Sequence, residues 1–124
     1  MKMPISEIVD RYTITKLKSE RTTENVSEEL NAYRLEIDQY SDSEINKYIE
    51  KLYDINGRLW DTEVQAARGA SSEQPPLEEI GRLALKVREI NCERNGIKAE
   101  VVEQFSEGFK EIKINYKKVN YGRS

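Results

Sequence analysis

Residues 44–105 read EINKYIEKLYDINGRLWDTEVQAARGASSEQPPLEEIGRLALKVREINCERNGIKAEVVEQF, and this stretch decides the fold. Apolar side chains recur in its first half at the spacing of one helix face, at Ile45, Ile49, Leu52, Ile55, Leu59 and Ala66. The second half repeats the pattern at Leu77, Ile80, Ala84, Val87, Val101 and Phe105. Gly69, a natural C-cap, and the prolines at 75 and 76 separate the two runs. We therefore predict helices over residues 43–68 and 76–107, folded back as an antiparallel hairpin.

Two shorter helices are predicted before the hairpin, over residues 6–22 and 25–40. Ser6 is typical of an N-cap, and Asn25 with Glu28 has the spacing of a capping box. Ser41 with Glu44 repeats that spacing at the start of the first long helix. The sequence thus predicts one all-α, bundle-like domain over residues 1–124.

The helix over 6–22 is apolar on two faces. Ile8 and Tyr12 lie on one face, and Ile14 and Leu17 lie nearly opposite. A helix of this kind is usually sandwiched between neighbours, which can include a second subunit. We therefore expect a homo-oligomer, most simply a dimer.

The sequence after Gly108 changes period. Apolar and polar residues alternate through Ile112, Ile114 and Tyr116, which predicts a short extended arm over residues 109–121. Residues 110–124 hold five basic side chains and one acidic one, which leaves the rest of the chain at −7 within a net charge of −3. The arm is expected to dock, with residues 1–5 as a possible partner strand.

Composition narrows the classes of function. The acidic body argues against nucleic acid as a partner. No apolar run is long enough to span a membrane, so a cytoplasmic protein is expected. Cys92 is the only cysteine and there is no histidine, which excludes an internal disulfide, a histidine-activated nucleophile and the usual zinc sites. The sequence indicates no cofactor.

Polar side chains interrupt the apolar stripes of three predicted helices. They are Asn91, Arg94 and Lys98 in 76–107, Asn56 and Glu63 in 43–68, and Asp10 and Arg21 in 6–22. Burial of such groups is costly unless they are paired. Two interpretations stay open: ion pairs that fix helix register, or a polar pocket between helices.

The pocket interpretation points to an anionic ligand. Arg21, Arg94 and Lys98 offer donors that suit a phosphate or carboxylate. Trp60 could supply a stacking surface, although an aromatic side chain at such a position more often fills the core.

An enzymatic alternative uses carboxylates. Glu7 with Asp10, and Glu100 with Glu103, have the spacing with which all-α nucleotide pyrophosphohydrolases hold Mg²⁺, but in reversed order along the chain. No catalytic residue is assigned on this basis.

Three stretches, residues 5–21, 55–63 and 87–98, together resemble a family of small helical proteins of unknown function found in bacteria and tailed phages. Some members of that family are fused to, or encoded beside, glycosyltransferase-like proteins. The family pattern falls on Glu7, Asp10, Thr13, Lys18, Arg21, Asn56, Trp60, Glu63, Arg68, Asn91, Arg94 and Lys98. This chain departs from the pattern at Val64, where the family has a second acid, and in its basic tail.

The function expected from these observations is that of a non-enzymatic, self-associating binding or accessory protein with an inter-helix site for a small anionic ligand, such as a nucleotide or sugar phosphate. The resemblance adds a possible phage origin. The alternatives are a Mg²⁺-dependent nucleotide-processing enzyme and a purely structural or protein-interaction subunit. The candidate ligand-binding residues are Asp10, Lys18, Arg21, Asn56, Trp60, Glu63, Asn91, Arg94 and Lys98, of which Lys18 rests on the resemblance alone.

Overall fold

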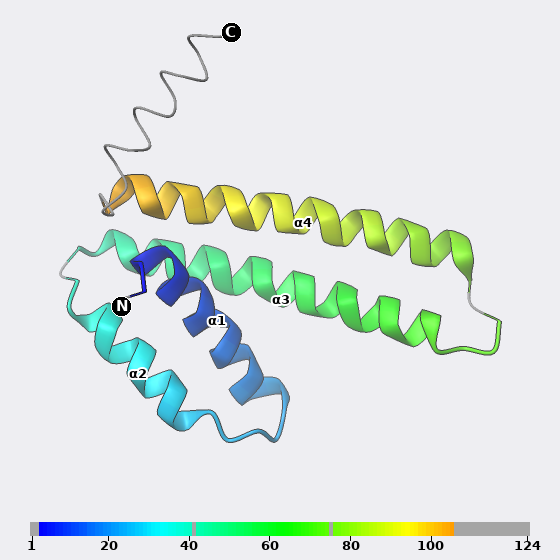
Figure 1. Cartoon of the computed structure of the whole chain (residues 1–124), viewed down its shortest axis with the longest axis horizontal. Coiled ribbons are helices and arrows are strands. Elements are labelled where there is room, and N and C mark those ends of the chain that lie inside the picture. The colour runs from blue at the N-terminus through cyan, green and yellow to red at the C-terminus, as the bar shows by residue number, and fades with distance from the viewer. Residues whose placement is uncertain (1–2, 41, 75, 106–124) are drawn as a thin grey trace, which may run out of the picture.

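The computed structural model describes residues 3–40, 42–74 and 76–105, and these form four helices (Figure 1). The helices are α1 (Ile5–Arg21), α2 (Ser27–Asp38), α3 (Glu44–Ala70) and α4 (Leu77–Gln104). The described residues contain no strand. The predicted all-α class, the long hairpin and the two shorter helices are confirmed.

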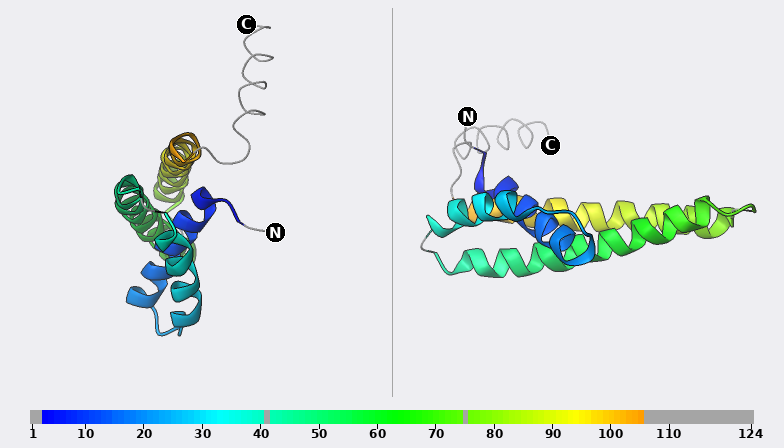
Figure 2. Two further views of the ribbon diagram at one scale, coloured as in Figure 1. Left: turned by 90° about the vertical axis from the view of Figure 1, so that its left-hand side faces the viewer. Right: turned by 90° about the horizontal axis from the view of Figure 1, so that it is seen from below.

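Helix α1 is the central element of the fold. It packs against α2, α3 and α4, whereas α2 packs mainly against α1. Figures 1 and 2 show α3 and α4 lying side by side as an antiparallel hairpin, with α1 and α2 beside only one half of it. The other half of the hairpin projects beyond α1 as a two-helix arm.

The main core lies where α1 meets the hairpin. Its buried apolar side chains come from all four helices, namely Ile5, Ile8, Val9, Tyr12, Ile37, Ile45, Tyr48, Leu52, Ile55, Leu59, Ile90 and Val101. Leu17, on the other face of α1, is 1 % exposed. Ile14, on the same face, is half-buried, so the second apolar face of α1 is largely covered within one chain, as in a sandwiched helix.

Helix starts differ from the predicted ones by one or two residues. Pro4, rather than Ser6, is the N-cap of α1, and its carbonyl accepts hydrogen bonds from the Glu7 and Ile8 amides at 3.0 and 3.1 Å. Ile5 is therefore helical and not part of a strand. The N-cap of α2 is Val26. Asn25, one residue earlier, accepts a hydrogen bond from the Ser27 amide, so the predicted capping box is out of place by one residue.

The hairpin loop corrects a second expectation. Gly69 lies inside the last turn of α3, and the C-cap is Ser71 in a right-handed conformation. A Cβ added at Gly69 would lie 3.4 Å from Ile80 Cγ1. Gly69 therefore lies where α4 packs against the end of α3, and it does not form a left-handed turn.

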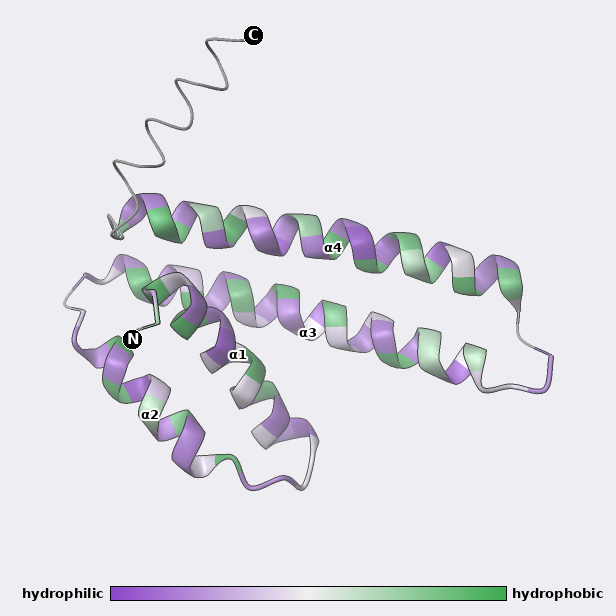
Figure 3. Cartoon of the chain, in the orientation of Figure 1, coloured by the Kyte–Doolittle hydropathy of each residue, from purple (hydrophilic) through white to green (hydrophobic). Residues whose placement is uncertain are grey.

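The predicted apolar stripe of α4 is wrong at its start. Leu77 is 77 % exposed and Ala84 is exposed, while Leu83 and Ile90 are buried. The reason is that this end of α4 has only α3 beside it, so the buried face is narrow. Figure 3 shows hydrophobic colour at the first turn of α4, at the end of the hairpin that lies away from α1 and α2.

Ser41 and the predicted arm over residues 109–121 lie outside the described residues. Within the described part of the chain, no helix is both long enough and apolar enough to cross a bilayer.

Two glycines of the hairpin should respond differently to added side-chain atoms. An alanine Cβ at Gly96 meets no atom within 4 Å, so Gly96→Ala should raise the free energy of unfolding by about 0.5–1 kcal/mol through helix propensity. Gly69→Val should lower it by about 1–3 kcal/mol, because its methyl groups crowd Ile80. Urea denaturation at 25 °C measures both changes, and a stabilising Gly69→Val would contradict the packing described here.

Candidate functional site

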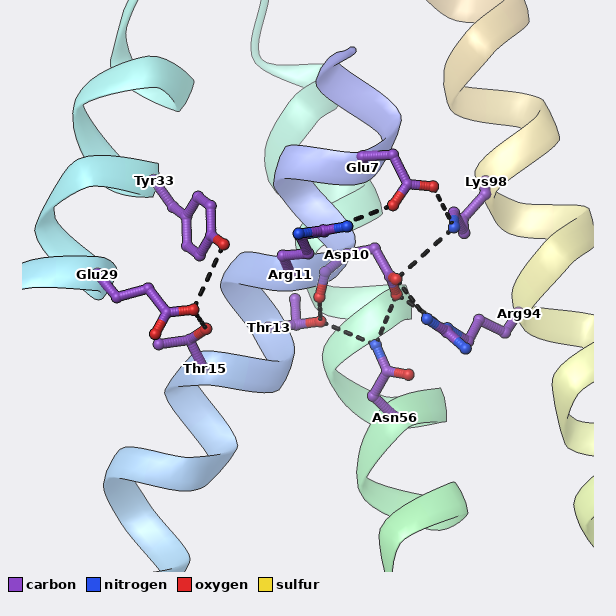
Figure 4. Close-up of polar contacts among 10 residues, drawn as sticks. All are labelled: Glu7, Asp10, Arg11, Thr13, Thr15, Glu29, Tyr33, Asn56, Arg94 and Lys98. Atoms are coloured by element: carbon purple, nitrogen blue, oxygen red, sulfur yellow. Dashed lines mark hydrogen bonds and ion pairs between the residues drawn. The ribbon is translucent and has the colours of Figure 1, made fainter. Parts of the chain in front are cut away.

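A buried carboxylate joins α1 to both helices of the hairpin. Asp10 of α1 is 1 % exposed. Arg94 of α4 meets it with two parallel hydrogen bonds, Nε to Oδ1 at 3.0 Å and Nη2 to Oδ2 at 2.6 Å. Asn56 of α3 donates Nδ2 to Oδ1 at 3.0 Å. Figure 4 shows the three side chains converging from the three helices. Both carboxylate oxygens are thus satisfied by groups far away in the sequence.

Further residues complete the group. Thr13 accepts a second hydrogen bond from Asn56 Nδ2 at 2.9 Å and donates its own hydroxyl to the Asp10 carbonyl at 2.7 Å. Lys98 lies 2.6 Å from a Glu7 carboxylate oxygen and 3.8 Å from Asp10. We call Glu7, Asp10, Thr13, Asn56, Arg94 and Lys98 the Asp10 cluster. Its two acids and two bases balance, so the cluster is internally neutral.

The electrostatics favour an ionised pair. Burial alone would raise the pKa of the Asp10 carboxyl, but hydrogen bonds from Arg94 and Asn56 and the charges of Arg94 and Lys98 outweigh it, so the pKa is lowered. The hydrogen bond to Asp10 raises the pKa of Arg94 against the effect of its own burial, and the charges of Asp10, Glu7 and Glu63 add to this. The bidentate geometry explains why an arginine occupies this position.

The Asn56 side chain is held in one orientation. A carboxylate can only accept hydrogen bonds, so the Asn56 nitrogen must face Asp10 and the oxygen must face away. Figure 4 shows this oxygen on the side of α4. Asn56 is 4 % exposed, and its Oδ1 atom has no hydrogen-bond donor among the described residues. A buried acceptor without a donor destabilises the folded state by about 1–3 kcal/mol, so a hydrogen-bond donor is expected to meet this atom.

A cavity of about 280 Å³ adjoins the Asn56 side chain between α1, α3 and α4. Its apolar wall consists of Ile14, Leu17, Leu59 and Trp60. Its polar wall consists of Asn56, Glu63, Asn91 and Arg94. The Asn91 oxygen accepts a hydrogen bond from Arg94 Nη1 at 3.3 Å, which leaves the Asn91 nitrogen able to donate. The cavity therefore combines an apolar surface with both donors and acceptors.

The structure divides the candidate site residues into groups. Asp10, Asn56, Arg94 and Lys98 belong to the Asp10 cluster, and Asn91, Glu63 and Trp60 line the adjoining cavity. Arg21 is separate: it pairs with Asp61 at 2.7 Å, and its guanidinium carbon lies 5.8 Å from the centre of the Trp60 ring. The expectation that Arg21 joins the Arg94 cluster is wrong, because Arg21 lies about 16 Å further along α1 than Asp10.

Lys18 belongs neither to the Asp10 cluster nor to the lining of the cavity. Its side chain forms no hydrogen bond or ion pair with the described residues, and its backbone carbonyl accepts hydrogen bonds from Thr22 at the end of the helix. Sequence reasoning from the apolar stripes also missed Thr13, which only the resemblance marked. A threonine three residues after a buried Asp is a weak signal, since its hydroxyl often bonds its own helix.

The carboxylate pairs of the enzymatic alternative are engaged in ion pairs. Glu7 bonds Lys98 and also lies 3.7 Å from Arg11, and Glu100 lies 3.8 Å from Lys51 of α3. Within the described residues, no three His, Cys, Asp or Glu side chains gather as ligands for a metal ion. The geometry therefore gives the Mg²⁺ enzyme no support.

Breaking the buried pair should cost far more than breaking an exposed one. Arg94→Met leaves the Asp10 carboxylate buried without its main partner, so the free energy of unfolding at pH 7 should fall by about 3–5 kcal/mol. The matched control is Arg58→Met, which removes an exposed α3–α4 pair with Glu93 at 3.3 Å and should cost at most about 1 kcal/mol. Equal small losses in urea denaturation would contradict the assigned role of Asp10.

Stability should depend on pH through the same carboxyl group. The folded pKa of Asp10 is lowered from an ordinary value of 3.8, so its contribution is complete above that value and is lost as the pH falls through the lowered pKa. The stability advantage of the wild type over Asp10→Asn should therefore be constant from pH 7 to about pH 5 and shrink below about pH 4. Denaturation curves across this range measure it. An advantage that already shrinks between pH 7 and 5 would indicate a raised pKa.

Comparison of the chain with protein-family models, with curated proteins and with solved structures gives no match. What the protein does is therefore inferred from the chemistry of the Asp10 cluster and the cavity beside it.

Proposed function

We propose that this chain is a non-enzymatic binding protein that holds a small polar molecule in the cavity between α1, α3 and α4. The observation that carries the proposal is the Asn56 oxygen. It is buried, the Asp10 carboxylate fixes its direction, and no described residue donates to it. Asn56 also lines a cavity large enough for several atoms, and a small shift of the lining side chains would let a bound N–H or O–H group satisfy this oxygen.

The cavity indicates the chemistry of the group it would hold. The positive charges of Arg94 and Lys98 are already balanced by Asp10 and Glu7, so the cavity itself does not call for an anion. Asn56 offers an acceptor, Asn91 offers a donor and Glu63 offers a charged acceptor near the apolar Trp60. This combination suits an uncharged ring with hydroxyl or amide groups, such as the sugar or base part of a larger ligand.

A structural role is the second candidate, and the internal neutrality of the Asp10 cluster favours it. A balanced buried ion pair can fix the register of α1 on the hairpin without any ligand. In that case the Asn56 oxygen would be bonded by an ordered water molecule, since the site is polar and roomy enough for one. The two candidates differ in whether a specific solute is retained.

Self-association is part of the proposal. The coverage of both α1 faces within one chain removes one reason for expecting a dimer. The remaining reason is α4, where Leu77 and Leu85 are 77 % and 61 % exposed on the projecting half of the hairpin. Apolar side chains of this size gain free energy when a second surface covers them.

We also propose that the chain belongs to the bacterial and phage family it resembles, and that it acts in the cytoplasm. Four residues of that family's pattern, Asp10, Thr13, Asn56 and Arg94, form one hydrogen-bonded group in this structure. These four residues come from three helices. Residues matched by chance are not expected to be hydrogen-bonded to one another, so their contact supports the resemblance.

Native mass spectrometry of gently purified protein tests the proposal. We expect a mass increment on the folded chain that disappears on unfolding, and the same spectrum reports the number of subunits. Glu63→Gln should lower the affinity for the bound molecule about tenfold, because a charged hydrogen bond is worth about 1.5–3 kcal/mol. A smaller fraction of the variant should then carry the mass increment. Glu73→Gln, an exposed change in the α3–α4 loop, is the control and should retain it.

Two results together would contradict the proposal. They are a native mass spectrum without a bound molecule, and Trp60 fluorescence that a panel of sugars and nucleosides leaves unchanged. Trp60 is the single tryptophan of the chain and lines the cavity, so a change in its emission reports binding next to its ring.

A further inference from the structure

A second hollow, of about 470 Å³, adjoins the cavity at Trp60. Its lining residues are Arg21 from the end of α1 and Trp60, Asp61, Val64, Gln65 and Arg68 from α3. Trp60 is the one residue that lines both spaces, so its side chain lies between them. The hollow runs along one face of α3, which rises about 12 Å between Trp60 and Arg68.

The charge of this hollow differs from that of the Asp10 cluster. Arg21 pairs with Asp61 through one nitrogen, Nη1, at 2.7 Å. The Arg68 side chain has no ion pair with the described residues. The hollow therefore has one positive charge in excess, whereas the charges of the Asp10 cluster balance.

The arginines also have donors left to use. Arg21 lies against the Trp60 ring and beside Gly57, where a Cβ would come within 3.5 Å of Nη2. The Asp61 pair and the Trp60 ring together hold the Arg21 guanidinium in place, so little side-chain entropy is lost when it binds an anion. A guanidinium offers five N–H donors, and Asp61 engages one of its nitrogens.

We propose that the hollow lined by Arg21 and Arg68 is a subsite for the phosphate, or a similar anionic group, of the molecule whose uncharged ring occupies the cavity. The inference rests on the proposed function. It assigns the anion to Arg21 and Arg68 on one side of Trp60, and the ring to Asn56 and Glu63 on the other. The ligand class is thus a phosphorylated sugar or a nucleoside monophosphate, in which an uncharged ring carries an anionic group.

Matched pairs of compounds test the subsite. Glucose is compared with glucose 6-phosphate, and uridine with uridine 5′-monophosphate, by titration of Trp60 fluorescence at constant ionic strength. The phosphorylated member of one pair should bind about tenfold more tightly, the effect of one charge-assisted hydrogen bond. Added salt should reduce this difference, because the hollow is open to solvent.

Variants separate the two spaces. Arg68→Gln should abolish the preference for the phosphorylated compound and leave the affinity for its uncharged partner unchanged. Arg58→Gln, an equal loss of charge on α3 at a residue that lines neither space, is the control and should keep the preference.

The outcomes distinguish the two proposals. If the uncharged compound binds but its phosphate gains nothing, and Arg68→Gln changes nothing, the subsite is refuted while the cavity stands. If no compound of either kind binds, the proposed function and the subsite both fall. If Arg58→Gln abolishes the preference as fully as Arg68→Gln does, the preference depends on the net charge of the protein and not on the hollow. That result would also overturn the subsite.

Discussion

Asp10 places an ionised carboxylate in the middle of a small helical core, and the rest of the structure is arranged around that charge. A buried carboxylate is stable only when charged and hydrogen-bonded partners replace the water it has lost. Arg94 and Asn56 provide them from the two helices of the hairpin. Since the bidentate bonds fit one geometry, they fix both the depth and the rotation of α1 on α3 and α4. Apolar packing alone allows helices to slide, whereas this pair permits a single register.

The same constraint creates the candidate site. The acceptor-only chemistry of the carboxylate turns the Asn56 nitrogen toward Asp10, and therefore leaves the Asn56 oxygen buried without a donor among the described residues. The register of α1 also sets Leu17 beside Leu59 and Trp60 on the cavity wall, and Arg21 over the far side of Trp60. The interpretation of the polar residues as structural ion pairs and their interpretation as a site are thus not exclusive. The Asp10 cluster links α1 to the hairpin, and the residues next to it form the proposed binding site.

Helical periodicity was sufficient to predict the four helices and to mark Asp10, Asn56, Asn91, Arg94 and Lys98 as inward-facing. Periodicity gives the face of a helix but not which residues of different helices meet, so it grouped Arg21 with Arg94. It also cannot say where a neighbouring helix stops. Leu77 follows the apolar pattern but lies beyond the reach of α1, which leaves it exposed. Gly69 has the sequence context of a C-cap, yet it lies inside the last turn of α3 and faces Ile80 across the loop. The Asn56 oxygen has no signature in the sequence, because its isolation follows from the tertiary bonds of Asp10.

The most direct measurement is nuclear magnetic resonance of the Asp10 carboxyl carbon and the Arg94 guanidinium in the intact protein near neutral pH. A buried bidentate pair should protect the Arg94 Nε proton from exchange and give a coupling through the hydrogen bond from Arg94 Nε to the Asp10 carboxyl carbon. On acid titration, the Asp10 carbon should change only below the ordinary carboxyl pKa of 3.8. A rapidly exchanging Arg94 proton, together with an Asp10 carboxyl that titrates at or above that value, would show that the charge does not organise this fold.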